Sequence, residues 1–224
     1  MLTNTEKQFT ILFFIIVFVE LLTGSTESLK NVHYIAKPAI VVSLIFLFIK
    51  TSESLSKPIR YLTLLALVFS LLGDVLLLFV DQSEHFFTLG LIAFLTAHLM
   101  YVVLFLKHRN KEKSPFGFIA LLLIYAASLF YFLEDGLGVM LIPVVIYMVV
   151  ILAMSTTAYL RKNKVNTLSY GLVFLGALFF MASDSILALN KFHQSIPWSN
   201  ISIMVTYAIA QYLIVLGVLK LKDK

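Results

Sequence analysis

The sequence predicts an all-α integral membrane protein: a bundle of eight transmembrane helices with both termini in the cytoplasm. Three observations predict it, namely the hydrophobic content, the scarcity of charge and the length of the apolar runs. Of the 224 residues, 60% are hydrophobic and 13% are charged, against about 45–50% and about 25% in soluble domains. So little charge excludes a soluble enzyme, a nucleic-acid-binding module and a receptor with a folded ectodomain. The chain has no cysteine, which excludes disulfides, thiolate zinc sites and cysteine nucleophiles.

Eight apolar stretches, separated by charged or turn residues, are the expected membrane spans. A span requires about 20 predominantly apolar residues, so the first two stretches must include flanking residues. In chain order the stretches are Phe9–Leu22, Ile35–Ile49, Ile59–Val80, Phe86–Leu106, Phe116–Leu133, Leu137–Leu160, Leu168–Leu189 and Ser199–Leu221.

The first stretch has a second interpretation, as a signal peptide. Lys7 precedes it, and the small residues Gly24 and Ser25 follow it, as in a secretory signal. Because no clear cleavage site follows, we favour a membrane span. The other seven stretches keep their topology under either interpretation.

The distribution of lysine and arginine sets the orientation of the expected bundle. Three of the 17 cations, Lys30, Lys37 and Lys191, lie on one side. Because positive residues mark the cytoplasmic side, the net charge of +5 is a topology signal and does not indicate nucleic-acid binding. The other fourteen are Lys7, Lys50, Lys57, Arg60, Lys107, Arg109, Lys111, Lys113, Arg161, Lys162, Lys164, Lys220, Lys222 and Lys224.

The chain is expected to form one transmembrane domain over residues 1–224, with a faint internal repeat. Gly73-Asp74-Val75-Leu76-Leu77 in the third stretch resembles Ser183-Asp184-Ser185-Ile186-Leu187 in the seventh. The two aspartates are 110 residues apart, which is close to half of the chain. A four-plus-four parallel duplication into residues 1–112 and 113–224 fits this spacing, although apolar helices also resemble one another by chance.

Polar groups inside the apolar stretches indicate a functional site. A charge near the membrane centre costs about 2.5–3.5 kcal/mol on the insertion scale, so such residues usually face a bundle interior. At about 1.5 Å per helical residue, Asp74 and Asp184 each lie roughly 8–9 Å below the outer boundary. The other polar groups of this kind are Glu20, Lys37, His98, Tyr101, Tyr207 and Gln211.

Helical spacing places six of these polar residues on four faces, three of which also carry small residues that let helices approach closely. Each has a structural interpretation as well. The aspartates would be partners of a buried lysine or of backbone groups, His98 a hydrogen-bonded core residue, and Gln211 and Tyr207 bridges between helices. Lys37 would snorkel to the interface ahead of Pro38 at a helix start, and Glu20 would end a helix there. The four faces are Ser70-Gly73-Asp74-Leu77, Gly90-Phe94-Ala97-His98-Tyr101, Gly176-Phe180-Ser183-Asp184-Leu187 and Tyr207-Gln211.

Two carboxyl groups that meet in a water-poor interior suit two kinds of function. One group can act as a general acid while the other stays ionised and acts as a general base, as in hydrolysis through an oxocarbenium-like cation. The same pair suits a proton-coupled carrier, because intramembrane carboxyl groups are common proton relays. A metal held by Asp74, Asp184 and His98 and a purely structural role are further alternatives. The residues alone leave the hydrolase and the carrier open.

Five motifs occur in order along most of the chain. Together they resemble the lysoplasmalogenases of the YhhN type, multispanning enzymes that cleave the vinyl ether of lysoplasmalogens. Any one motif is weak evidence, whereas the ordered set is specific to the family. The motifs are Lys37-Pro38, Ser70-Leu71-Leu72-Gly73-Asp74, Phe87-x-x-Gly90-x-x-x-Phe94-x-x-Ala97-His98-x-x-Tyr101, Gly176-Ala177-x-x-Phe180-x-x-Ser183-Asp184-x-x-Leu187-Ala188 and Tyr207-x-x-Ala210-Gln211-x-Leu213-Ile214.

The resemblance implies eight helices and an ether hydrolase of lipid metabolism. We expect no cofactor and no metal. Its essential acids would map onto Asp74 and Asp184, and its substrate would be a lysophospholipid drawn from the membrane. Lys37 is expected to contact the substrate phosphate, and the location expected for the chain is a bacterial inner membrane. The residues expected to orient water or tune the acids are His98, Tyr101, Tyr207, Gln211, Ser70 and Ser183.

Overall fold

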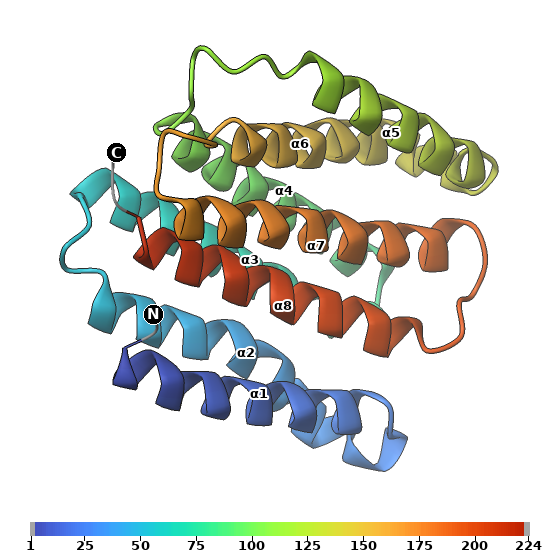
Figure 1. The fold of residues 1–224 in the computed structure, drawn as a ribbon. Coiled ribbons are helices and arrows are strands. Elements are labelled where there is room, and N and C mark those ends of the chain that lie inside the picture. The colour runs from blue at the N-terminus through green and yellow to red at the C-terminus, as the bar shows by residue number, and fades with distance from the viewer. Residues whose placement is uncertain (1–2, 222–224) are drawn as a thin grey trace. The chain divides into compact units, whose positions relative to one another are not determined.

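The computed structural model describes residues 3–221, and these residues form an all-α structure that contains no β-strand (Figure 1). The all-α class that the sequence predicts is therefore confirmed. The helices are α1 (Asn4–Gly24), α2 (Lys30–Thr51), α3 (Lys57–Leu77), α4 (Glu84–Leu106), α5 (Phe116–Leu137), α6 (Leu141–Tyr159), α7 (Thr167–Phe192) and α8 (Ser199–Leu219), with short 3₁₀ helices at Glu27–Leu29 and Gly138–Met140.

Within residues 3–221, seven segments are long and apolar enough to cross a membrane, so the chain is an integral membrane protein. Phe116–Tyr159 counts as one of the seven, although it contains both α5 and α6. Figure 1 shows that the chain reverses between them, so that α6 runs back beside α5. Eight crossings and cytoplasmic termini stay predictions. Lys222 and Lys224, two of the cations used to orient the chain, lie outside the described residues.

The helices group into two compact units, and the division falls inside α4. Unit 1 ends at Ala97 and unit 2 begins at His98. The expected half-repeats divide the chain elsewhere, between residues 112 and 113. The single domain and the duplication stay predictions.

Unit 1 contains α1, α2, α3 and the first part of α4. α1 packs against α2 and α2 packs against α3, with Phe13, Ile40 and Leu44 among the fully buried side chains. A capping box begins α1: Thr3 Oγ1 accepts a hydrogen bond from the Glu6 amide, and the Glu6 carboxylate accepts one from the Thr3 amide. These contacts fix the first turn of a helix that then runs through apolar residues.

α2 begins earlier than the sequence predicts. A helix start at Lys37-Pro38 was expected, but α2 begins at Lys30 and Pro38 lies inside it. That prediction is wrong because the apolar run marks only part of the helix, whose first two turns carry polar residues. Pro38 has no amide hydrogen to donate to the Tyr34 carbonyl, yet the helix continues through it. Lys37 is consequently a residue of the helix interior.

Unit 2 contains the last part of α4 and the helices α5 to α8. α7 and α8 lie side by side, and α5 and α6 both pack against α7 (Figure 1). A Cβ atom at Gly176 would lie 2.7 Å from Cγ1 of Ile214 and 2.9 Å from the Ala210 carbonyl oxygen. Only glycine therefore allows α7 and α8 their close contact at this level, as the sequence pattern predicts.

Candidate functional site

Asp184 on α7 is the centre of a polar cluster in unit 2. The Tyr147 hydroxyl on α6 donates a hydrogen bond of 2.6 Å to Asp184 Oδ2. His98 Nε2 on α4 lies 3.7 Å from the same oxygen. The Asp184 side chain is 15% exposed, so residues of α4 and α6 contact a carboxyl group that is mostly buried.

His98 is fully buried beside Asp184 and is held there by ring packing. Its ring meets Tyr147 edge to face at 5.3 Å between centroids and Phe180 at 4.5 Å. Among the described residues, neither ring nitrogen has a hydrogen-bond partner. A buried polar atom without a partner is costly, so His98 has an unused donor and an unused acceptor for a water molecule or a substrate oxygen.

A second polar group in unit 2 joins Tyr101, Gln211 and Tyr207. The Tyr101 hydroxyl donates to Gln211 Oε1 at 3.0 Å, and Gln211 Nε2 donates to the Tyr207 hydroxyl at 3.3 Å. All three side chains are buried. Phe180 meets the rings of both Tyr207 and His98 edge to face. One aromatic side chain therefore separates this network from the Asp184 cluster.

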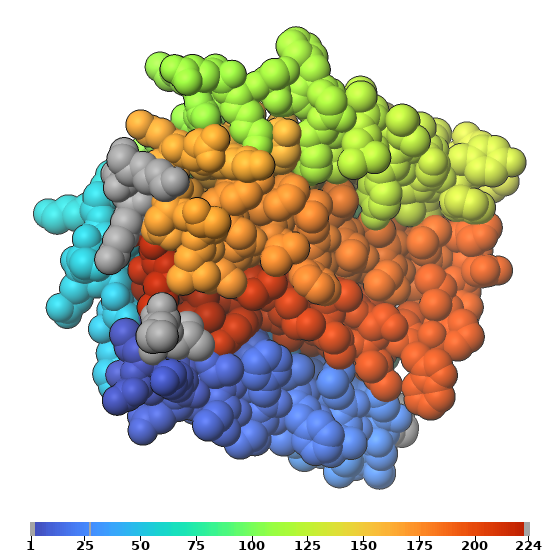
Figure 2. Space-filling view, in the orientation of Figure 1, coloured from blue at the N-terminus to red at the C-terminus, as the bar shows by residue number. Residues whose placement is uncertain are grey.

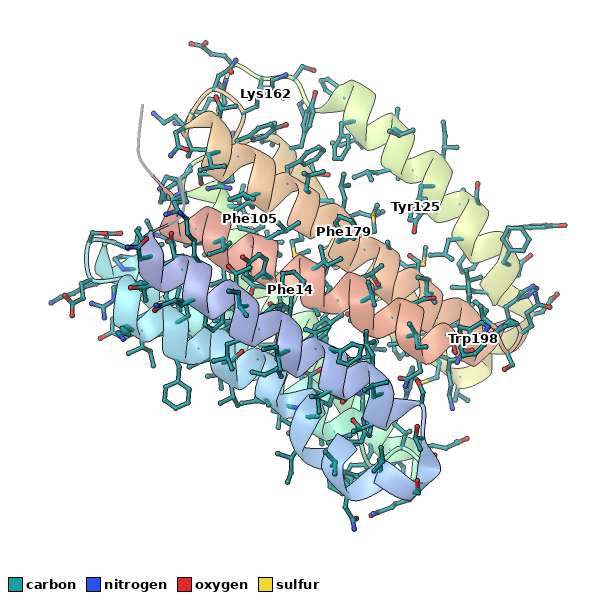
Figure 3. All side chains as sticks on the ribbon, turned by 60° about the horizontal axis from the view of Figure 1, so that its bottom comes forward. Phe14, Phe105, Tyr125, Lys162, Phe179 and Trp198 are labelled. Atoms are coloured by element: carbon teal, nitrogen blue, oxygen red, sulfur yellow. The ribbon has the colours of Figure 1, made fainter. Side chains whose placement is uncertain are left out.

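Ser183 precedes Asp184 but makes a different contact. Its hydroxyl donates to the Ile203 carbonyl of α8 at 3.0 Å, which ties α7 to α8. Ser185, which follows Asp184, contacts the Tyr125 hydroxyl of α5 at 2.6 Å; Figure 3 labels Tyr125. The two neighbours of Asp184 therefore hold α7 between two other helices.

Asp74 on α3 is the buried acid of unit 1, with 2% of its surface exposed. Ser70, one turn earlier, is fully buried, and its hydroxyl has no partner among the described residues. A Cβ atom at Gly73 would lie 2.5 Å from the Phe94 ring, so glycine permits the approach of α4 next to Asp74. This acid thus lies on the packed side of α3.

Lys37 lies in the same unit as Asp74 and is half-buried. The charges that act on it are those of Asp74, the stronger, and Glu20. Glu20 is fully buried on α1, and its Oε2 lies 3.0 Å from Nδ1 of His33, one turn before Lys37 on α2. Glu20 is thus a buried, paired group one turn before the end of α1.

Sequence reasoning missed Tyr147 and His33. Tyr147 lies in a continuous apolar run, where a tyrosine that hydrogen-bonds inside the bundle has the same pattern as one that faces lipid. His33 lies ahead of the expected start of its helix, so it was not counted with the membrane residues. A helix start placed at Lys30 would have put His33 and Lys37 on one face at i, i+4.

The structure brings together Asp184, His98 and Tyr147 in unit 2, and Asp74, Lys37 and Glu20 in unit 1. Within either unit, the described residues form no group of three His, Asp or Glu side chains that could hold a metal ion. Two protonatable carboxyl groups in apolar surroundings can donate and accept protons. Polar hydroxyl, imidazole and ammonium groups next to them can orient a water molecule or a polar substrate.

Comparison with known proteins shows a family. The chain matches the model of the YhhN family over residues 32–218. Human lysoplasmalogenase TMEM86A is 33% identical over 162 residues, which cover 70% of this chain and 65% of that protein. Human lysoplasmalogenase TMEM86B is 33% identical over 161 residues, which cover 69% of this chain and 62% of that protein. The matched region is thus less than two thirds of either relative, and no solved structure matches the chain.

Proposed function

Because the chain belongs to the YhhN family, we propose that it hydrolyses the vinyl ether bond of a lysoplasmalogen in the membrane. The observation that carries this proposal is the 33% identity to human lysoplasmalogenase TMEM86A across 70% of the chain. The products would be a fatty aldehyde and a glycerophospho-ethanolamine or glycerophospho-choline. The buried acids of α3 and α7 supply groups that suit this reaction.

The proposed reaction uses Asp74 and Asp184 as an acid and a base. The protonated aspartate donates its proton to the vinyl carbon that is not bonded to oxygen, and this forms an oxocarbenium ion. The ionised aspartate accepts a proton from water as the water oxygen bonds to the cationic carbon. The first aspartate, now ionised, accepts the hydroxyl proton of the resulting hemiacetal. The second aspartate, now protonated, donates its proton to the glycerol oxygen as the bond from the hemiacetal carbon to that oxygen breaks. One water molecule is consumed, and both carboxyl groups return to their starting states.

Tyr147 and His98 support this reaction through their contacts with Asp184. The Tyr147 hydroxyl binds Oδ2, so it fixes the plane of the carboxyl group and leaves Oδ1 to exchange a proton. His98, whose ring nitrogens have no partner among the described residues, would hold the attacking water molecule. The network of Tyr101, Gln211 and Tyr207 keeps the neighbouring helices in register and would line the polar end of the substrate site.

Lys37 is the group proposed to receive the substrate phosphate. The charge of Asp74 acts on Lys37 more strongly than that of Glu20 does, so a phosphate bound there would bring the adjacent ether towards that acid. The alkenyl chain would remain among apolar side chains, because contact between apolar groups carries no desolvation cost. Glu20 and His33, paired at 3.0 Å, would hold the end of α1 against α2 beside Lys37.

The proposed topology has eight crossings, with α5 and α6 as separate spans and both termini in the cytoplasm. α5 has 22 residues and α6 has 19, which correspond to about 33 Å and about 28 Å at the helical rise. Each length matches a hydrocarbon core of about 30 Å. An even number of crossings leaves both chain ends on one side, where positive residues accumulate.

The proposal is tested with purified protein in detergent micelles that contain lysoplasmalogen and an excess of chelator. We expect release of fatty aldehyde, because acid–base hydrolysis requires neither a membrane gradient nor a metal. A lysophospholipid with an ester-linked chain is the matched control and should release no aldehyde. Substrate movement in sealed vesicles under a proton gradient, without aldehyde in micelles, would favour the proton-coupled carrier and would contradict the hydrolase.

A further inference from the structure

We propose that unit 2 also contains a binding site for the phosphate group of an anionic phospholipid, built by the loops that follow α4 and α6. A pocket of about 580 Å³ opens between these loops, and a second of about 460 Å³ adjoins it. The two pockets share Asn110, Glu112 and Asn163. In Figure 2 the surfaces of the two loops adjoin at the upper left, green against orange. The first pocket is lined by Arg109, Asn110, Lys111, Glu112, Asn163 and Lys164.

The charge of this surface is strongly positive. Arg109, Lys111 and Lys164 line the first pocket, and Lys113 and Lys162 line the second. Glu112 is the acidic residue among the lining side chains, and none of the five cations forms an ion pair with a residue in the described part of the chain. Five cations next to one carboxylate attract an anion, and the planar guanidinium of Arg109 suits phosphate in particular.

The loops are tied to one another, so the backbone that carries the cations is held in place. The Asn110 amide donates to the Leu160 carbonyl at 2.7 Å, and Asn110 Nδ2 donates to the Lys162 carbonyl at 3.2 Å. Asn163 takes a left-handed backbone conformation with φ 67°, which turns the second loop. Lys113 Nζ lies 3.5 Å from the centre of the Tyr159 ring, a cation–π contact. A site whose frame is already ordered loses less entropy when it binds a ligand.

The position of the pockets selects the ligand. They lie where α4 ends at Leu106, α6 ends at Tyr159 and α7 begins at Thr167. Lys162, at this end of unit 2, lies far from Trp198, which precedes α8 at the other end (Figure 3). The ends of membrane-spanning helices lie at the level of the lipid head groups, and basic pockets between such helices bind anionic head groups. The anion expected at this level is therefore a lipid phosphate.

The test measures lipid retention by native mass spectrometry of the whole protein in micelles. Wild-type protein should retain phosphatidylglycerol in preference to zwitterionic phosphatidylcholine. The variant R109Q/K162Q/K164Q should retain at least about tenfold less phosphatidylglycerol, because it loses three of the charge-assisted contacts. The matched control is K50Q/K57Q/R60Q, which removes the same charge from the last turn of α2 and the first turn of α3 and should change retention less than about twofold.

Each contrary outcome would overturn the proposal. Equal losses in the two triple variants would show attraction by net charge and not a site. Equal retention of the two lipids by the wild type would show that the site does not select an anionic head group. Displacement of the lipid by equimolar inorganic phosphate would show that the ligand is free phosphate. All six replaced residues are outside the proposed catalytic groups, so unchanged aldehyde release and an unchanged elution volume show that each triple variant is folded. The variant R109E/K164E, which reverses two charges, repeats the measurement with fewer substitutions.

Discussion

Asp184 is held by side chains of unequal kinds: a phenol within 2.6 Å and an imidazole whose nearest nitrogen is 3.7 Å away. The short contact sets the orientation of the carboxyl group. The longer one leaves the imidazole free for a bound water molecule. In surroundings that are otherwise apolar, such fixed dipoles act more strongly than they would in water. The effect of each partner on the reaction is therefore measurable separately.

At the residue scale, Tyr147→Phe removes the hydroxyl that orients Asp184 and keeps the ring that packs on His98. We expect kcat to fall about tenfold with KM within about twofold of wild type, because a displaced catalytic group slows the chemical step more than binding. Tyr125→Phe is the matched control, since it removes a hydroxyl of the same unit that contacts Ser185. Steady-state aldehyde release measures both variants, and equal effects would remove Tyr147 from the proposed mechanism.

The sequence predicts which side chains are unusual but not which of them touch. A charge in an apolar run is visible without coordinates, so Asp74, Asp184 and Lys37 are identified directly. The partner of such a charge is invisible when it is a tyrosine, because tyrosine is common throughout membrane helices. Gln211 and Tyr207 were predictable as neighbours, because i, i+4 spacing fixes them on one helix face. The contact of Tyr101 with Gln211 joins separate helices and required the structure.

At the scale of elements, the pairing of α7 with α8 rests on glycine at the contact. Gly176 faces Ile214 and the Ala210 carbonyl, whereas a Cβ atom at Gly171 would meet nothing within 4 Å. The sequence distinguishes them only by helix face, because Gly176 shares the face of Asp184 and Gly171 does not. Likewise, hydropathy locates the apolar part of α2 but not its polar first turns, which explains the error at Lys37-Pro38.

The pairing predicts different outcomes for two matched substitutions in α7. Gly176→Leu should lower the free energy of unfolding by about 1–3 kcal/mol, because an added side chain in a packed interface forces the helices apart. Gly171→Leu should leave it unchanged or slightly raised, since leucine is the better helix former. Thermal unfolding in detergent compares the two. A loss as large for Gly171→Leu as for Gly176→Leu would contradict close packing at Gly176.

At the scale of the whole molecule, length and composition were enough to predict an all-α integral membrane protein. The number of membrane crossings depends on whether α5 and α6 are separate spans. By length and composition they count as one segment of 44 residues, whereas the charged residues Glu134 and Asp135 and the reversal of the chain at Gly138–Met140 separate them. Gly138 takes φ +47° there, a conformation that glycine adopts readily and that no apolar pattern reveals.

The topology predicts that a reporter inserted at Gly138–Met140 lies outside the cytoplasm, while reporters at both chain ends lie inside it. A further reporter in the loop after α6 should lie in the cytoplasm, because that loop carries Arg161, Lys162 and Lys164. Paired reporters active only inside and only outside the cytoplasm measure the side. A reporter at Gly138–Met140 on the same side as both chain ends would leave α5 and α6 as one membrane element and would contradict eight crossings.

The central claim is that Asp74 and Asp184 act in one hydrolytic step, and aldehyde release by three variants tests it most directly. Asp74→Asn and Asp184→Asn should each lower turnover by at least about 10²-fold, the usual effect of a positioned acid or base. The double variant should lose little more, because groups that act together are not additive. Asp81→Asn, which replaces an exposed aspartate paired with Lys30, should keep wild-type turnover. Near-normal turnover in either single variant would contradict the claim.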